Sequence, residues 1–132
     1  MNASTFTLRS RASWIMAGAF AVFLAACGGS GDDIIPDTIT IQAFDGPTTV
    51  HAGDSVSERA IVVRTGNINN ADLAYSWVQS SGIPVLNLAG TNTSTITFTA
   101  PPVTQDSAVL FKLTVTGRGH TEEKDLTLTV QP

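Results

Sequence analysis

The segment Leu73-Ala74-Tyr75-Ser76-Trp77 places large apolar side chains at every second position and small residues between them. A period of two is typical of a β-strand with one buried face, because successive side chains on a strand point to opposite sides of the sheet. Threonine fills many alternate positions in other segments, where its β-branched side chain suits a solvated strand face. The other inward-facing sets are Ile39 and Ile41; Ile96 and Phe98; Phe111, Leu113 and Val115; and Leu126, Leu128 and Val130.

Turn-forming residues separate these alternating segments. Glycine, proline, asparagine and aspartate cluster at residues 45–47, 52–54, 65–67, 90–92, 101–102 and 117–119. Short strands at this spacing, each with one apolar face, favour an all-β fold in which two sheets pack face to face. The sequence therefore predicts an antiparallel β-sandwich over residues 38–132.

One predicted strand, residues 55–64, contains a residue that breaks the pattern. Glu58 has the same parity as Val56, Ala60 and Val62, so a regular strand would point its carboxylate into the core. Two interpretations remain open: a β-bulge shifts the register after Arg59, or Glu58 lies at an exposed strand end.

Three separated motifs occur in a familiar order. Residues 75–85 read YSWVQSSGIPV, residues 97–101 read TFTAP, and residues 113–116 read LTVT. This resembles the immunoglobulin-like PKD superfamily, in particular its bacterial variant with a Tyr-Ser-Trp-x-Gln strand and a Phe-Thr-Ala-Pro strand end. Residues 50–56 also resemble an early strand of that family. The typical Trp-Asp-Phe-Gly-Asp-Gly pattern is absent, which indicates a divergent member.

The resemblance implies an immunoglobulin-like sandwich in which Trp77 fills the core between the sheets. It also implies a spacer or binding role rather than catalysis. With the alternation described above, the expected core side chains are Trp77, Tyr75, Phe98, Phe111, Leu113 and Val115.

The N-terminal region has the pattern of a secretory signal peptide. Arg9 and Arg11 lie in a polar stretch without acids, and residues 14–26 are all apolar or small. A bilayer-spanning helix needs about 20 such residues, so this run is too short to be a stable span. We therefore expect residues 1–26 to be removed.

The end of that run, Leu24-Ala25-Ala26-Cys27, resembles the lipobox of bacterial lipoproteins. The resemblance implies cleavage between Ala26 and Cys27, with Cys27 then carrying lipid on its sulfur and nitrogen. Gly28 stands where an aspartate would indicate inner-membrane retention, so the outer membrane of the cell envelope is favoured, on its periplasmic or surface face. Residues 27–37 are expected to form a flexible tether because they are rich in Gly and Asp.

Charge and composition exclude several classes of protein. Without residues 1–26, five basic residues face eleven acidic ones, a formal charge of −6, which gives no electrostatic footprint for nucleic acid. One cysteine allows no internal disulfide or cysteine-cluster metal site. No motif calls for a cofactor, and Asp54, Asp72 and Asp106 lack the spacing of a calcium loop.

We expect a membrane-anchored lipoprotein that presents one immunoglobulin-like module for protein–protein interaction, adhesion or envelope assembly. We expect the contact surfaces at sheet edges and at residues 66–72 and 117–123. The alternative is a module that binds envelope polysaccharide, which exposure of Trp77 or Tyr75 would favour. An enzyme would need His51 or His120 beside a serine and a carboxylate.

Overall fold

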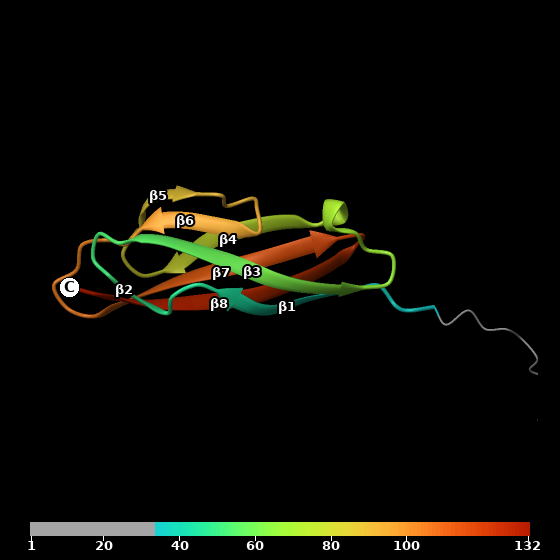
Figure 1. Ribbon diagram of the computed structural model, residues 1–132, viewed down its shortest axis with the longest axis horizontal. Helices are drawn as coiled ribbons and strands as arrows, with labels where there is room; N and C mark the ends of the chain where they lie inside the picture. Colours follow the sequence, from blue (N-terminus) through green and yellow to red (C-terminus); the bar gives the residue numbers. More distant parts are fainter. Residues whose placement is uncertain (1–33) are drawn as a thin grey trace, which may run out of the picture. The chain divides into compact units, whose positions relative to one another are not determined.

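Two four-stranded sheets pack face to face in the part of the chain that the structure, a computed structural model, describes: residues 34–132 (Figure 1). The first sheet has the order β1 (Thr38–Asp45), β3 (Ser55–Thr65), β6 (Thr95–Thr99), β5 (Leu86–Ala89). The second has the order β2 (Thr49–His51), β8 (His120–Gln131), β7 (Ser107–Gly117), β4 (Ala74–Ser81). A single 3-10 turn, η1 (Asn70–Asp72), precedes β4. The predicted signal peptide and Cys27 lie outside the described residues.

Strand pairing confirms the predicted antiparallel sandwich. All pairs are antiparallel except the three-residue contact of β2 with β8. That contact arises because the chain leaves the first sheet after Asp45 and joins the second sheet at Thr49. Alternation of apolar and polar side chains along each strand directs one face of each sheet into a shared core.

The core contains the side chains that the alternation points inward. Phe111, Leu113 and Val115 of β7 are fully buried, and Phe98 and Trp77 are 3% exposed. The rings of Phe98 and Phe111 lie 5.1 Å apart and join the two sheets. All of these buried apolar residues belong to residues 39–130, so residues 34–132 have a complete core of their own and form one folding unit.

Tyr75 differs from the other expected core side chains. It packs against the core but remains half-buried. It lies near the start of β4, at the edge of the second sheet, so one side of the ring stays open to solvent.

Glu58 is buried within β3, and both interpretations of this strand from sequence were wrong. The side chain is 1% exposed, and Glu58 pairs with Ile96 in an unbroken register. The register shift lies instead on the neighbouring strand β1, between Ile41 and Ala43. Because the extra residue is on β1, β3 keeps its period and Glu58 stays on the inward face.

Other parts of the fold were not predicted correctly or not predicted at all. Residues 117–123 are not a loop, because the turn spans only Arg118 and Gly119 and β8 begins at His120. The short edge strand β5 was not predicted; it has four residues, and its Leu86 and Leu88 side chains are exposed. Within residues 34–132, no helix is long and apolar enough to cross a membrane.

Truncation of Trp77 should severely destabilise the domain. Trp77→Ala in residues 34–132 should lower the free energy of unfolding by about 3–5 kcal/mol, because it leaves a large cavity between the sheets. Val78→Ala changes the next residue, whose side chain is 58% exposed, and should cost less than about 0.5 kcal/mol. Urea unfolding followed by circular dichroism measures both. Equal losses for the two variants would contradict the position of Trp77 in the core.

Candidate functional site

The sandwich is open on one side because β6 is shorter than β3. β6 pairs with Ser55 to Arg59 of β3, and the rest of β3 pairs only with β1 among the described strands. Figure 1 shows β6 running beside one half of β3, while the other half faces β4 of the second sheet. The second half of β3 is therefore a free strand edge.

The loop between β5 and β6 closes the sandwich at one end of this opening. Ala60 donates its backbone N–H to Ser94 O at 2.8 Å, and Trp77 donates its own to Thr91 O at 2.8 Å. The Trp77 indole Nε1 also donates to Thr93 O at 3.0 Å. These three hydrogen bonds tie β3 and β4 to one loop. Farther along β3, toward Arg64, no hydrogen bond found within residues 34–132 joins the two strands.

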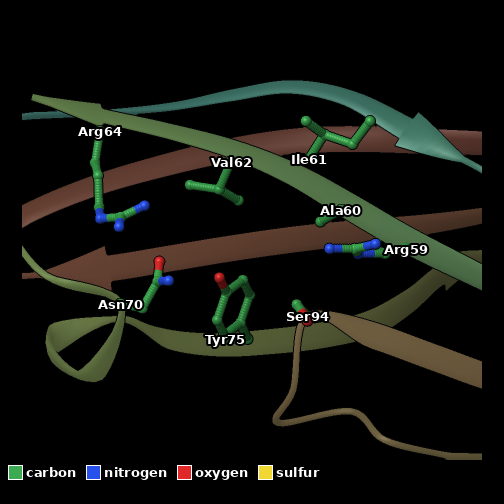
Figure 2. A pocket seen from close by; sticks show the side chains of 8 residues that line it. All are labelled: Arg59, Ala60, Ile61, Val62, Arg64, Asn70, Tyr75 and Ser94. Carbon is green, nitrogen blue, oxygen red and sulfur yellow. The ribbon is translucent and has the colours of Figure 1, made fainter.

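The resulting pocket, which we call the slot, has a volume of about 470 Å³. In Figure 2, Arg64, Val62 and Tyr75 point into the space between β3 and β4, whereas Ile61 points away from it. The volume lies within the usual range for ligand pockets. Its lining residues are Arg59, Ala60, Ile61, Val62, Arg64, Asn70, Tyr75 and Ser94.

The slot holds the two arginines of the domain that lack an acidic partner among residues 34–132. Lys112 pairs with Glu123, and Arg118 pairs with Asp37. The Lys124 ammonium donates to two backbone carbonyls of β1 and lies 5.9 Å from the centre of the Phe44 ring. Arg64 donates only its Nε, to Ile68 O at 3.1 Å. Two of the five cations of residues 34–132 therefore line the slot without an ion pair.

The aromatic side chains do not form an exposed sugar-stacking surface. Trp77 is buried against Phe44, with 5.5 Å between the ring centres. Phe98 and Phe111 are also buried, and only Tyr75 has a ring face near the slot. A single half-buried tyrosine is a weak platform for a saccharide, which usually stacks on exposed rings.

The histidines lie too far apart to act together. His51 pairs with Gln131 at one end of β8, and His120 begins the same strand. Eleven residues of extended chain separate those ends, about 36 Å. Asp54 accepts a hydrogen bond from the His51 backbone N–H, and Asp72 accepts one from the Asn69 N–H. Both carboxylates thus act as turn caps.

No cluster of three metal-ligating side chains occurs within residues 34–132. Asp106 lies on an exposed loop before β7, away from Asp54 and Asp72 in the chain.

Glu58 is the one strongly perturbed acid of the described residues. Burial raises its pKa to about 7, and repulsion from Asp45 adds to the shift. Its Oε1 has no hydrogen-bond partner. The carboxyl packs against Gly46, where any Cβ would overlap it, so the loop between β1 and β2 approaches closely only because residue 46 has no side chain.

Glu58 should make the domain less stable as pH rises. Below pH 4.5 the carboxyl is protonated in both the folded and unfolded states, so it carries no ionisation penalty. Between pH 4.5 and about 7 the unfolded chain ionises while the folded carboxyl keeps its proton, which lowers the free energy of unfolding by up to about 3 kcal/mol, and above about pH 7 the loss is constant. Glu58→Gln should remove that loss in urea titrations at pH 4 and pH 8.

Asp106→Asn is the control, because it changes an exposed carboxylate and leaves Glu58 intact. It should keep the pH dependence of the wild type. If Glu58→Gln and the wild type lose the same stability between pH 4 and pH 8, the buried carboxyl is not the cause.

Gly46→Ala should destabilise the domain through the same contact, by about 1–3 kcal/mol, because the new methyl group overlaps the Glu58 carboxyl. The double variant Gly46→Ala, Glu58→Ala should lose less stability than the sum of the two single variants, since shortening residue 58 makes room. Thermal unfolding of all four proteins forms the cycle. Additive losses would show that the two residues do not meet.

The two sheets form an immunoglobulin-like β-sandwich module, and the polar slot lies open on one side of it. Residues 49–130 match the family model of the K319L-like PKD domain. The chain belongs to this family, which agrees with the strand motifs around Trp77 and Phe98.

This chain is similar to part of a carbohydrate-related protein, a chitinase. Chitinase A of Pseudoalteromonas piscicida is 30% identical over 98 residues, which cover 74% of this chain and 11% of the relative. The chain therefore spans only about a tenth of the length of that relative.

Two solved structures match this chain, each with a TM-score of 0.46. One is a nucleoside hydrolase-related hypothetical protein from Saccharophagus degradans that is associated with carbohydrate metabolism, 14% identical, with 74% of this chain and 25% of that chain covered. The other is a sialyltransferase from Photobacterium damsela, 25% identical, with 62% and 18% covered.

The sequence identified the elements around the slot but not its charged residues. Sheet edges and residues 66–72 were expected contact surfaces, and Asn70 does line the slot. Arg59 and Arg64 were not singled out, because they lie on opposite faces of one strand, and only the end of β6 opposite Arg59 leaves the edge between them open. The one available signal was that few basic residues occur in an acidic chain.

Proposed function

We propose that this protein is a lipid-anchored, non-catalytic binding module that contacts a protein partner at the bacterial cell envelope. The observation that carries the proposal is the free edge of β3 beside the slot, since a strand edge with unpaired backbone groups is a common site of protein–protein contact. The lipid anchor on Cys27 and the outer-membrane location come from the lipobox resemblance.

Hydrogen bonds at Pro36 and Asp37 attach the start of the domain to β3 and to the residues after it, which limits the length of the predicted tether. Thr65 Oγ1 donates to Pro36 O at 2.6 Å, and the Asn67 N–H donates to Asp37 Oδ1 at 2.7 Å. These bonds fix the chain from Pro36 onward, so at most residues 28–35 are free to extend, about 28 Å. An anchor on Cys27 would hold the domain close to its membrane.

That anchor would place the slot in the half of the domain near the membrane. Thr38 pairs with Thr65 at the end of β3, and Arg64 is the slot residue next to it. Figure 1 shows Pro132 at the opposite end of the domain. A partner at the slot would thus lie close to the membrane surface.

A polysaccharide-binding module is the second candidate, favoured by the relationship to a chitinase. The burial of Trp77 opposes it, because the indole cannot stack on a sugar ring. An exposed protein-binding edge is the better account of the geometry.

Substitution of the predicted anchor residue tests the location. Cys27→Ser should move the full-length protein from the membrane pellet to the soluble fraction after a high-salt wash, because without acyl chains a domain of charge −6 has no attraction to anionic lipid. Thr38→Ser, which keeps the predicted lipobox, serves as the control and should stay in the pellet. A Cys27→Ser protein that still sediments would refute the anchor.

Cross-linking in cells tests the partner class. Full-length protein carrying a photo-reactive residue in place of Asn70, an exposed residue that lines the slot, should yield a discrete cross-linked species that contains peptides of a second protein. The same residue at Asp106, on an exposed loop, should not. A species whose added mass is removed by glycosidase, and which contains no peptides of a second protein, would favour the polysaccharide-binding candidate instead.

A further inference from the structure

We propose that the slot accepts an extended, acidic segment of the partner protein, which pairs as an added strand with β3 and places carboxylates on Arg59 and Arg64. This inference rests on the proposed protein-binding function and names the chemistry of the partner. Three features of the slot support it: its backbone, its charges and its length.

The backbone of β3 offers unpaired groups to such a strand. The Ala60 N–H points toward the β6 side, where it meets Ser94 O. Because backbone groups alternate sides along a strand, those of Val62 and Arg64 point the same way, beyond the last residue of β6. An incoming segment would continue the line of β6 along β3.

The charges select an acidic segment. Arg59 and Arg64 form no ion pair with a carboxylate of residues 34–132, although Asp45 is the cross-strand neighbour of Arg59 on β1, while the other three cations of that region are engaged. Arg64 uses only its Nε, at Ile68 O, which fixes the side chain and leaves its terminal nitrogens to a ligand. The overall charge of −6 would otherwise repel an acidic partner, so attraction is confined to the slot.

The length of the edge sets the spacing of the acids. Arg59 and Arg64 lie five residues apart, about 17 Å along the strand, and on opposite faces. A matching segment has two acidic side chains five residues apart, which also fall on opposite faces of an extended chain. Asn70 and Tyr75 line the side of the slot opposite β3. Their amide and hydroxyl groups supply hydrogen bonds for the backbone groups of the segment that face away from β3.

Nuclear magnetic resonance titration of residues 34–132, which have their own core, tests the inference. The probe is a Thr-rich synthetic peptide of about ten residues with Glu at two positions five apart. It should slow hydrogen exchange at the amides of Val62 and Arg64, because both would gain a hydrogen bond, and its binding should weaken at high salt. The same peptide with Gln at those positions should bind about tenfold more weakly.

Substitutions separate the charges from the fold. Arg59→Gln with Arg64→Gln should weaken binding of the Glu peptide by about tenfold or more, and Lys112→Gln, which removes an engaged cation on the second sheet, should not. Unfolding curves verify that each variant is folded. Binding without protection of Val62 and Arg64, equal binding of the Glu and Gln peptides, or no binding of the Glu peptide would overturn the added strand.

The cross-linking assay distinguishes failure of this inference from failure of the proposed function. If the Arg59→Gln, Arg64→Gln protein cross-links its protein partner as well as the wild type does, the slot inference fails and the protein-binding function stands. If wild-type protein yields no protein partner, the proposed function itself fails. An oligogalacturonate that binds at Arg59 and Arg64 while the Glu peptide does not would assign the slot to an acidic polysaccharide and overturn the inference.

Discussion

Trp77 is the contact on which the rest of the domain depends. Its indole fills the space between the sheets against Phe44, and its two N–H groups bond to the loop that also holds Ala60. One residue thereby joins β4 to the β5–β6 loop and, through that loop, to β3. The point where this closure ends is also the point where the slot begins, so packing of the core determines the position of the candidate site.

Burial of the Glu58 carboxyl lowers the stability of the fold, and this effect is unrelated to the slot. Its carboxyl is buried without a partner for Oε1, and Gly46 closes over it where the chain crosses from one sheet to the other. A buried acid that titrates near neutral pH opposes folding at and above that pH, so apolar burial elsewhere must exceed this penalty. The stability of the domain is thus coupled to the tightness of one loop.

The alternation of side chains was enough to predict the sandwich, because burying one face of each strand imposes a period of two on the sequence. It was not enough at Glu58 or at β5. Charge alone argued against burial of Glu58, yet the register set by Val56 and Ala60 prevailed because shifting it would have exposed both. β5 has only four residues, which is too short a run for alternation to distinguish a strand from a loop. The slot arises from unequal strand lengths, which periodicity does not report.

The difference in length between β3 and β6 links structure to function. A β6 extended by about five residues in the same register would cover Val62 and Arg64, satisfy their backbone groups and remove the opening. The strand is short because Thr91 and Thr93 accept hydrogen bonds from Trp77, so the chain before β6 turns toward β4 and does not continue along β3. Edge strands left open invite aggregation unless charge or a bound partner protects them. Arginines at both ends of this open edge provide such protection in the free protein and a means of selecting an acidic strand in the complex.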